Sequence, residues 1–301
     1  MVAPSRDEHS RDKHSRDKLR RAFRVSAARA DAVGPVRDGD LRAPNLRDRL
    51  LRRLGQFTAT PRPVVELPPG EVTQTQHGPM WRREMRHSLD FVHGNVALGR
   101  ARSLDGERLA LLAKDRTFAT LDGSECLFLD TETTGLAGGA GTVVFAYGLA
   151  FFRAQEFVVE QLFLRDFGEE QAILHHVKAR LLEFPVPVTF VGKSFDRHRI
   201  AARLGVHKIQ ALVLTPRHLD LYHLVKRAHG KGLPDTRLRT VEQRLLGLDR
   251  HDDLPGSEAP AAFLDWIRDR TGPVDRVLEH NRLDVLSLAA LLGMLAGRAS
   301  T

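Results

Sequence analysis

Apolar and polar positions begin to follow a regular order at about residue 122, and the order predicts a succession of strands and helices. Three runs rich in β-branched and aromatic residues, at 125–131, 142–152 and 157–164, are typical of buried strands. Only short turn or polar segments separate these runs. We therefore expect the regular part of the chain to open with an antiparallel β-meander.

Helical and strand patterns alternate over the remainder of the chain. We expect helices at about 169–182, 194–204, 219–229, 238–246, 260–270 and 273–297, with a short strand at 185–192 and a further apolar segment at 211–214. The resulting βββ-α-β-α-β-α order predicts an α/β fold, in which a mixed β-sheet is flanked by α-helices.

The preceding part of the chain is less regular and divides at a proline-rich linker. Residues 1–68 begin with a repeated Ser-Arg-Asp pattern that has almost no apolar surface to bury, so we expect a partly disordered extension. A short amphipathic helix after Asn45 is the exception that we predict within it. We interpret residues 69–121 as a lead-in subdomain that packs against a main domain at 122–298.

Composition narrows the setting in which the chain works. Hydrophobic residues make up 42% of the 301 residues, enough for a core, and no apolar stretch is long enough for a membrane span. The single cysteine, Cys126, excludes an intramolecular disulfide, and the charged N-terminus is unlike a secretory signal, so we expect a cytoplasmic protein. The net charge of +8 lies almost wholly in residues 1–68, which is typical either of a phosphate-binding arm or of a solubilising tail.

The first predicted strand ends in two carboxylates, Asp130 and Glu132. Residues two apart on an extended backbone point to the same side, so both side chains emerge together. Carboxylates crowded in this way repel one another unless cations neutralise them, and hard ions such as Mg²⁺ and Mn²⁺ prefer oxygen ligands. Taken alone, the pair is better interpreted as a solvated strand end, and further carboxylates are needed to change that view.

Three downstream acids bear on this question. Asp196 lies where a short buried strand turns into a helix, and Asp284 lies on a C-terminal helix with apolar flanks. His280 precedes Asp284 by four residues, so both share one helix face, either beside a metal site or as a self-contained ion pair. Asp220 follows another apolar segment, and we expect it to cap the next helix.

These residues resemble known motifs. The segment Asp130-Thr131-Glu132-Thr133-Thr134-Gly135 resembles the first motif of the DEDD 3′–5′ exonucleases, which have a ribonuclease H-like fold. Ser194-Phe195-Asp196 resembles the second motif, and the segment from His280 to Asp284 resembles the third. More narrowly, residues 122–292 resemble the YprB-type ribonuclease H-like domain, through segments at 192–196, 218–221, 240–247, 253–256 and 280–281.

The resemblance implies a metal-dependent 3′–5′ exonuclease that acts on the end of single-stranded DNA or RNA. It implies that two Mg²⁺ or Mn²⁺ ions are held by the four carboxylates Asp130, Glu132, Asp196 and Asp284, with His280 as the candidate general base. Thr133, Lys193, Phe195 and Arg197 are the candidate substrate-binding residues. The basic ones among them are interpreted equally well as a solvated helix face.

Two departures from the family pattern keep an alternative open. Val191 stands where an asparagine often precedes the second-motif aspartate, and three residues separate His280 from Asp284 where histidine-type members usually have four. The alternative is a nucleic-acid-binding module that keeps the fold but has lost turnover. A third hypothesis is a phosphoesterase for small nucleotides. DNA or RNA preference and exo or endo cleavage are left undecided by the sequence.

The remaining histidines give no convincing metal site. His87 and His93 have no third ligand at suitable spacing, so we predict ordinary hydrogen-bonded roles. His218, His223 and His229 lack cysteine partners and have basic neighbours, so we predict surface histidines rather than zinc ligands.

Overall fold

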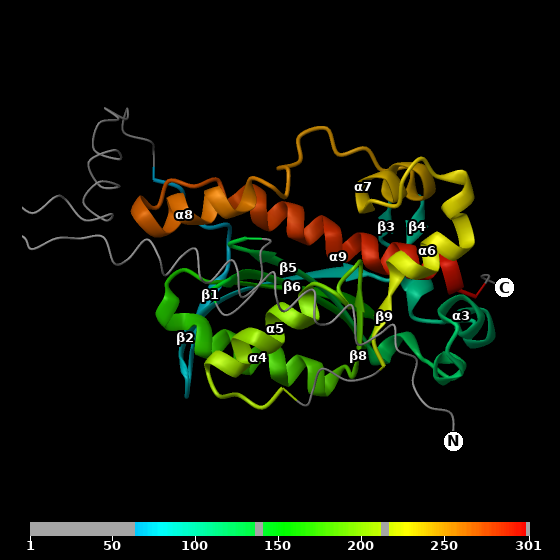
Figure 1. The fold of residues 1–301 in the computed structure, drawn as a ribbon, viewed down its shortest axis with the longest axis horizontal. Helices are drawn as coiled ribbons and strands as arrows, with labels where there is room; N and C mark the ends of the chain where they lie inside the picture. Colours follow the sequence, from blue (N-terminus) through cyan, green and yellow to red (C-terminus); the bar gives the residue numbers. More distant parts are fainter. Residues whose placement is uncertain (1–63, 136–140, 212–216, 299–301) are drawn as a thin grey trace, which may run out of the picture. The chain divides into compact units, whose positions relative to one another are not determined.

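The structure, a computed structural model, describes residues 64–135, 141–211 and 217–298 (Figure 1). Within these ranges one mixed β-sheet forms the centre of the molecule, with strands in the order β1-β2-β7-β6-β5-β8-β9. Its strands are β1 (Glu71–Thr75), β2 (Gly78–Ser88), β5 (Cys126–Thr133), β6 (Val144–Arg153), β7 (Glu156–Phe163), β8 (Val186–Thr189) and β9 (Leu219–Asp220), and a separate hairpin pairs β3 (Val92–His93) with β4 (Val96–Ala97).

Strand β5 joins the antiparallel and parallel parts of the sheet. It pairs antiparallel with β6, with a register shift between Glu132 and Thr133, and parallel with β8, which pairs parallel with β9. Parallel strands end at the same edge of a sheet. The carboxylates of β5, the loop after β8 and Asp220 at the end of β9 are therefore brought to one edge.

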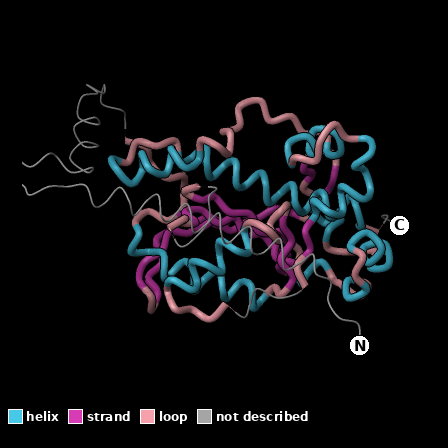
Figure 2. Tube along the Cα trace, in the orientation of Figure 1, coloured by secondary structure: helices cyan, strands magenta, loops and turns pink. Residues whose placement is uncertain are grey.

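Helices cover both faces of this sheet. Figure 2 shows the strands as a central layer, with α4 and α5 on one side and the long α9 on the other. Helix α9 packs across β5, β6 and β7. The helices are α3 (Gly106–Ala113), α4 (Glu170–Glu183), α5 (Asp196–Val206), α6 (Leu221–His229), α7 (Leu238–Val241), α8 (Ala259–Asp269) and α9 (Val274–Ala296), with a π-helical turn at Glu242–Leu246 and short 3-10 turns at Leu98–Ala101, Arg116–Phe118, Gly123–Glu125, Phe167–Glu169 and Gly230–Gly232.

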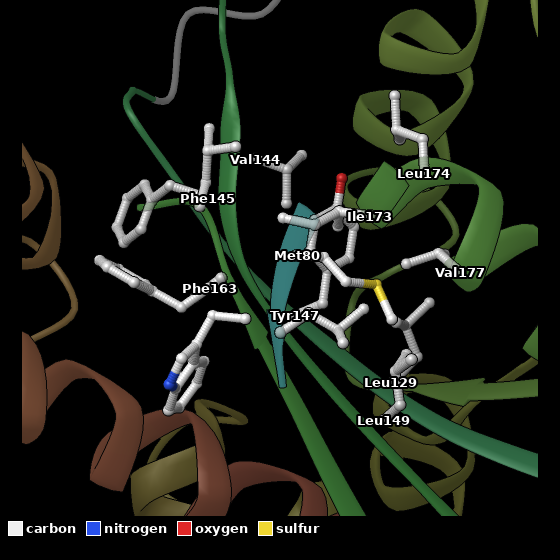
Figure 3. Packing of buried hydrophobic residues seen from close by; sticks show 14 of the residues in the cluster. Met80, Leu129, Val144, Phe145, Tyr147, Leu149, Phe163, Ile173, Leu174 and Val177 are labelled. Atoms are coloured by element: carbon white, nitrogen blue, oxygen red, sulfur yellow. The ribbon is translucent and has the colours of Figure 1, made fainter. Parts of the chain in front are cut away.

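The core consists of two apolar layers, one on each face of the sheet. In Figure 3, Leu129 of β5 and Tyr147 of β6 pack with Ile173 and Val177 of α4. The opposite layer contains Phe128 of β5 and the C-terminal half of α9, which is apolar on nearly every side and fully buried. Alternate residues of β5 thus serve opposite layers, which fixes the register of the strand that carries Asp130.

The predicted mixed sheet flanked by helices is confirmed. The strand expected at 185–192 ends earlier, at Thr189, because the next backbone N–H groups bind the Asp220 side chain instead of a neighbouring strand. Strands β1 and β2 come from the region interpreted as a lead-in subdomain, yet β2 pairs with β7 in the main sheet. The proposed domain boundaries, 1–68, 69–121 and 122–298, stay predictions.

Some predictions concern residues that are not described. Residues 1–63, which include the helix expected after Asn45, and most of the apolar segment at 211–214 lie outside the described ranges. Within those ranges no helix is both long and apolar enough to cross a lipid bilayer. The cytoplasmic location stays a prediction.

Candidate active site

The two carboxylates of β5 lie on the side of the strand that faces α9. Asn281 of α9, which is fully buried, donates from Nδ2 to Asp130 Oδ2 at 2.9 Å. Gln161 of β7 in turn donates to Asn281 Oδ1 at 3.1 Å and to the Leu278 carbonyl at 2.6 Å. A chain of buried amides therefore fixes Asp130 from two neighbouring elements. Neither amide was predicted as a site residue, and the only signal for Asn281 was its place beside His280 in the family resemblance.

The second-motif carboxylate reaches the site from the opposite side of β5. Asp196 begins α5 and is 4% exposed. The Thr131 hydroxyl, which points away from Asp130 and Glu132 because it lies between them on the strand, donates a short hydrogen bond to Asp196 Oδ1. Thr131 was not among the predicted site residues. It holds the aspartate against the end of the strand.

Asp220 has the capping role that was predicted and a second role. Its carboxylate accepts from the Tyr222 backbone N–H at 3.2 Å, which caps α6. It also accepts from the backbone N–H groups of Val191 and Lys193 at 2.9 and 3.1 Å. The same side chain thus starts one helix and shapes the loop that leads into Asp196.

The third-motif histidine is oriented by a residue outside the predicted set. His280 Nδ1 donates to Asp253 Oδ2 at 2.8 Å, while Nε2 faces Glu132 at 3.9 Å and Asp284 at 3.7 Å. Burial lowers the pKa of His280, but the hydrogen bond to Asp253 and the charges of Asp284 and Glu132 outweigh burial and raise that pKa to about 9. These neighbours therefore favour the protonated form of His280 in this conformation.

A buried arginine, Arg250, occupies one side of the acidic centre. Its guanidinium contacts Asp284 Oδ1 at 2.6 Å and Asp253 Oδ2 at 3.2 Å through Nη1, and it makes a short ion pair with Glu242 through Nη2. The Arg250 side chain is 7% exposed. Glu242 begins the π-helical turn, which replaces the second half of the regular helix expected at 238–246, while α7 forms the first half. Arg250 could not be predicted as a site residue, because nothing in the spacing of a loop arginine shows which carboxylates it will contact.

The negative charges of the site's carboxylates are not balanced by enough neighbouring positive charge. Burial, followed by the neighbouring carboxylates, raises the pKa of Asp130 well above its usual value. Burial likewise raises the pKa of Glu132 to about 8, although His280 opposes the shift, and the pKa of Asp196 to about 6. Such a cluster is stabilised by added cations, and oxygen donors of this kind match Mg²⁺ or Mn²⁺. Among the described residues, however, no three acidic, histidine or cysteine side chains converge closely enough to hold an ion in this conformation.

A cavity of about 270 Å³ opens beside these groups. Apolar residues such as Leu238 and Leu254 form part of its wall. Its charged lining comes from α7, the π-turn, the following loop and α9, and consists of Arg239, Glu242, Arg250, Asp253, His280 and Asp284. The cavity therefore presents cationic and anionic side chains together, next to Glu132.

Three of the four candidate substrate-binding residues lie at the start of α5, and the fourth, Thr133, ends β5. Lys193 is exposed and Arg197 is half-buried, while Phe195 lies under Arg199, whose guanidinium is 4.7 Å from the ring centroid. Thr133 is buried, and its hydroxyl donates to the Gly135 carbonyl at 3.1 Å. Lys193, Phe195 and Arg197 therefore lie at the same loop–helix junction as Asp196.

The other histidines differ in environment. His93 shares a 2.8 Å hydrogen bond with the Ser287 hydroxyl, as expected of an ordinary histidine, whereas His87 Nε2 is buried without a hydrogen-bond partner among the described residues. The prediction of a surface position is wrong for His218, which is 2% exposed. It shares a 2.7 Å hydrogen bond with Thr189, because the segment leading into β9 runs beneath the loop after β8.

Comparison with known proteins identifies the class to which this fold and site belong. A family model described as the RNase_H superfamily matches residues 127–296, and the chain belongs to that superfamily, whose fold is of the nuclease type. The chain is also 35% identical over 167 residues to a Bacillus subtilis (strain 168) protein described as uncharacterized protein YprB. That alignment covers 54% of this chain and 40% of the relative, so the match spans less than half of the relative's length. The resemblance to the YprB type is confirmed.

Proposed function

We propose that this protein is a metal-dependent nuclease that hydrolyses phosphodiester bonds of single-stranded nucleic acid, as a 3′–5′ exonuclease. The observation that carries the proposal is that Asp130, Glu132, Asp196 and Asp284, which come from β5, α5 and α9, lie close enough for their charges to act on one another. These charges help to raise the pKa values of the first three. Membership of the ribonuclease H superfamily supports hydrolysis of nucleic acid by such a centre.

In this proposal the same four carboxylates would hold two Mg²⁺ or Mn²⁺ ions, which would supply activation of a water molecule and stabilisation of negative charge on a leaving oxygen. The chain's own contribution is to fix the ligands before substrate arrives. Asn281 holds Asp130 and Thr131 holds Asp196, so neither carboxylate needs to be ordered during the reaction.

The remaining residues of the proposal act on substrate and protons. Lys193 and Arg197 contact phosphates of the entering strand, and Phe195 offers a face for a terminal base. His280 accepts a proton only in its neutral form. Cations held by these carboxylates would offset the charges of Glu132 and Asp284 that raise the pKa of His280, and would make the neutral form accessible. Asp253 keeps Nε2 directed at the centre by occupying Nδ1.

The first prediction tests this assignment. Asp130→Asn should abolish Mn²⁺-dependent degradation of single-stranded DNA and RNA, because it removes one ligand charge while leaving an isosteric side chain beside Asn281. The assay uses 3′- and 5′-end-labelled strands, which also reveal polarity and substrate preference. Asp275→Asn, at an exposed position in the first turn of α9, is the matched control and should retain wild-type activity. Full activity of Asp130→Asn would exclude the mechanism.

A second candidate function rests on the ion pair between Arg250 and Asp284. A centre that keeps its carboxylate bound to arginine suits a nucleic-acid-binding module without turnover. Calorimetric titration with Mn²⁺, followed by the degradation assay, separates the two functions. Strand binding with no cleavage product at any Mn²⁺ or Mg²⁺ concentration would favour the binding module.

A further inference from the structure

We propose that Arg250 is a built-in competitor of the divalent cation at Asp284, so that this carboxylate takes up metal only when the guanidinium leaves it. The inference rests on the proposed function, since it assumes that Asp284 is a metal ligand. It adds a residue that sets the metal affinity of the centre and that no part of the family resemblance names.

The first argument is the position of the guanidinium. Nη1 lies 2.6 Å from Asp284 Oδ1, which is a direct charge-assisted contact, and the same nitrogen reaches Asp253 Oδ2 at 3.2 Å. A divalent cation that bound the same oxygen would share its ligand with a positive charge. The Arg250 and Asp284 side chains are only 7% and 13% exposed, so two positive charges this close would be poorly screened by water and would repel strongly. Arginine and metal therefore exclude each other at this oxygen.

The second argument is that Arg250 can leave Asp284 without becoming an unpaired buried charge. Its Nη2 group remains paired with Glu242, which is 2% exposed and belongs to the π-helical turn rather than to α9. The cavity of about 270 Å³ beside Arg250 provides space for the side chain to turn. Arg250 can therefore release Asp284 while it stays paired with Glu242, and no local unfolding is required.

The third argument is the electrostatic pattern across the centre. Arg250 contacts Asp284 directly, whereas within the described residues the side-chain partners of Asp130 and Asp196 are the neutral Asn281 and Thr131, and the basic partner of Glu132 is His280, at 3.9 Å. Among the four proposed ligands in the described part of the chain, arginine is therefore paired with Asp284 alone. Metal should bind first among the uncompensated carboxylates, and the position at Asp284 should be the one controlled by Arg250.

The test is Mn²⁺ binding by isothermal titration calorimetry, with the full chain and without substrate. Arg250→Gln should bind Mn²⁺ at least about tenfold more tightly than wild type, or bind one additional ion, because it removes the competing charge. Arg239→Gln is the matched control. Arg239 lines the same cavity, but its Nη2 donates to the Arg250 carbonyl at 3.3 Å and not to a carboxylate, so the variant should titrate like wild type.

Thermal unfolding gives an independent readout. Arg250→Gln should have a lower Tm than wild type in chelator, since three carboxylates lose their partner, and Mn²⁺ should raise its Tm more than that of wild type. If Arg250→Gln does not fold in chelator, Arg250→Lys provides the same comparison. Its ammonium cannot span Glu242 and Asp284 in the same way, and its Mn²⁺ affinity should again exceed that of wild type.

The outcomes separate this inference from the proposed function. Equal Mn²⁺ affinity and stoichiometry in wild type and in the Arg250 variants would overturn the competition, while metal binding by both would leave the nuclease proposal intact. Failure of wild type and variants alike to bind Mn²⁺ would overturn both. Tighter binding in Arg239→Gln as well would also overturn the inference, because loss of any cavity arginine would then suffice.

Discussion

Val191 is held in the left-handed backbone region, with φ at 65°, although a β-branched side chain is poorly suited to that region. The conformation is imposed by Asp220, which binds the backbone N–H groups on either side of Gly192. A Cβ atom at Gly192 would come within 2.7 Å of Asp196 Oδ2, so the turn lies directly against the second-motif aspartate. Local strain is accepted here because the turn shapes the site.

The strained valine leads to a prediction about stability. Val191→Asn should raise the free energy of unfolding by about 1 kcal/mol, because asparagine adopts the left-handed region more readily than a β-branched residue. Val206→Asn, at the exposed end of α5, is the control and should give no stabilisation. Urea unfolding measures both, and a Val191→Asn protein no more stable than wild type would contradict the interpretation.

At the scale of elements, features that follow the period of a strand or a helix could be predicted from the sequence. Contacts between residues far apart in the chain could not. The period-two alternation of β5 places Asp130 and Glu132 on one side, and the strand–helix junction locates Asp196. The amide that holds Asp130 comes from 151 residues away, and Arg250 reaches Asp284 across 34 residues from a loop without periodicity. Such partners depend on how α9 packs on the sheet. These contacts arise from tertiary packing, and the sequence of a single segment does not reveal them.

The close packing of α9 against β6 can be tested with a double-mutant cycle. A Cβ atom added at Gly148 would lie 2.5 Å from Asn281 Oδ1, so Gly148→Ala should destabilise the protein or displace the amide that fixes Asp130. Asn281→Ala alone should cost about 1–3 kcal/mol, because it removes the hydrogen bond to Asp130 and one of the two hydrogen bonds of Gln161.

In the double variant the new methyl group occupies space that the amide has left. We therefore expect the combined loss of stability to be smaller than the sum of the two, by about 0.5–3 kcal/mol. Gly205→Ala in α5, where the added methyl group meets no atom within 4 Å, is the control and should show additivity with Asn281→Ala. Additive effects at Gly148 and Asn281 would show that the close approach is absent in solution.

Over the whole molecule, buried titratable groups act in two opposite directions. The acidic centre holds carboxylates whose pKa values are raised, so protonation of Glu132 and Asp196 stabilises the fold as the pH falls. Two buried histidines have the opposite effect and reduce the stability of the fold as the pH falls. Burial, and then nearby arginines and lysines, lower the pKa values of His93 and His218 to about 4. The two groups of residues therefore contribute to the acid stability of the domain in opposite directions.

The histidine contribution can be isolated. Each histidine is neutral in the folded state down to about pH 4 but takes up a proton in the unfolded chain below its usual pKa of 6.5. Its contribution to stability is therefore complete above pH 6.5 and is lost as the pH falls through that window, by up to about 3 kcal/mol for each residue. The double variant His93→Gln/His218→Gln, in which glutamine can still hydrogen-bond to Ser287 and Thr189, should lose less stability on acidification than wild type. Urea unfolding in chelator from about pH 7.5 to about pH 4.5 measures the difference, in which the carboxylate contribution cancels. Parallel pH profiles for the two proteins would mean that these histidines take up protons equally in the folded and unfolded states, and that their burial does not govern acid unfolding.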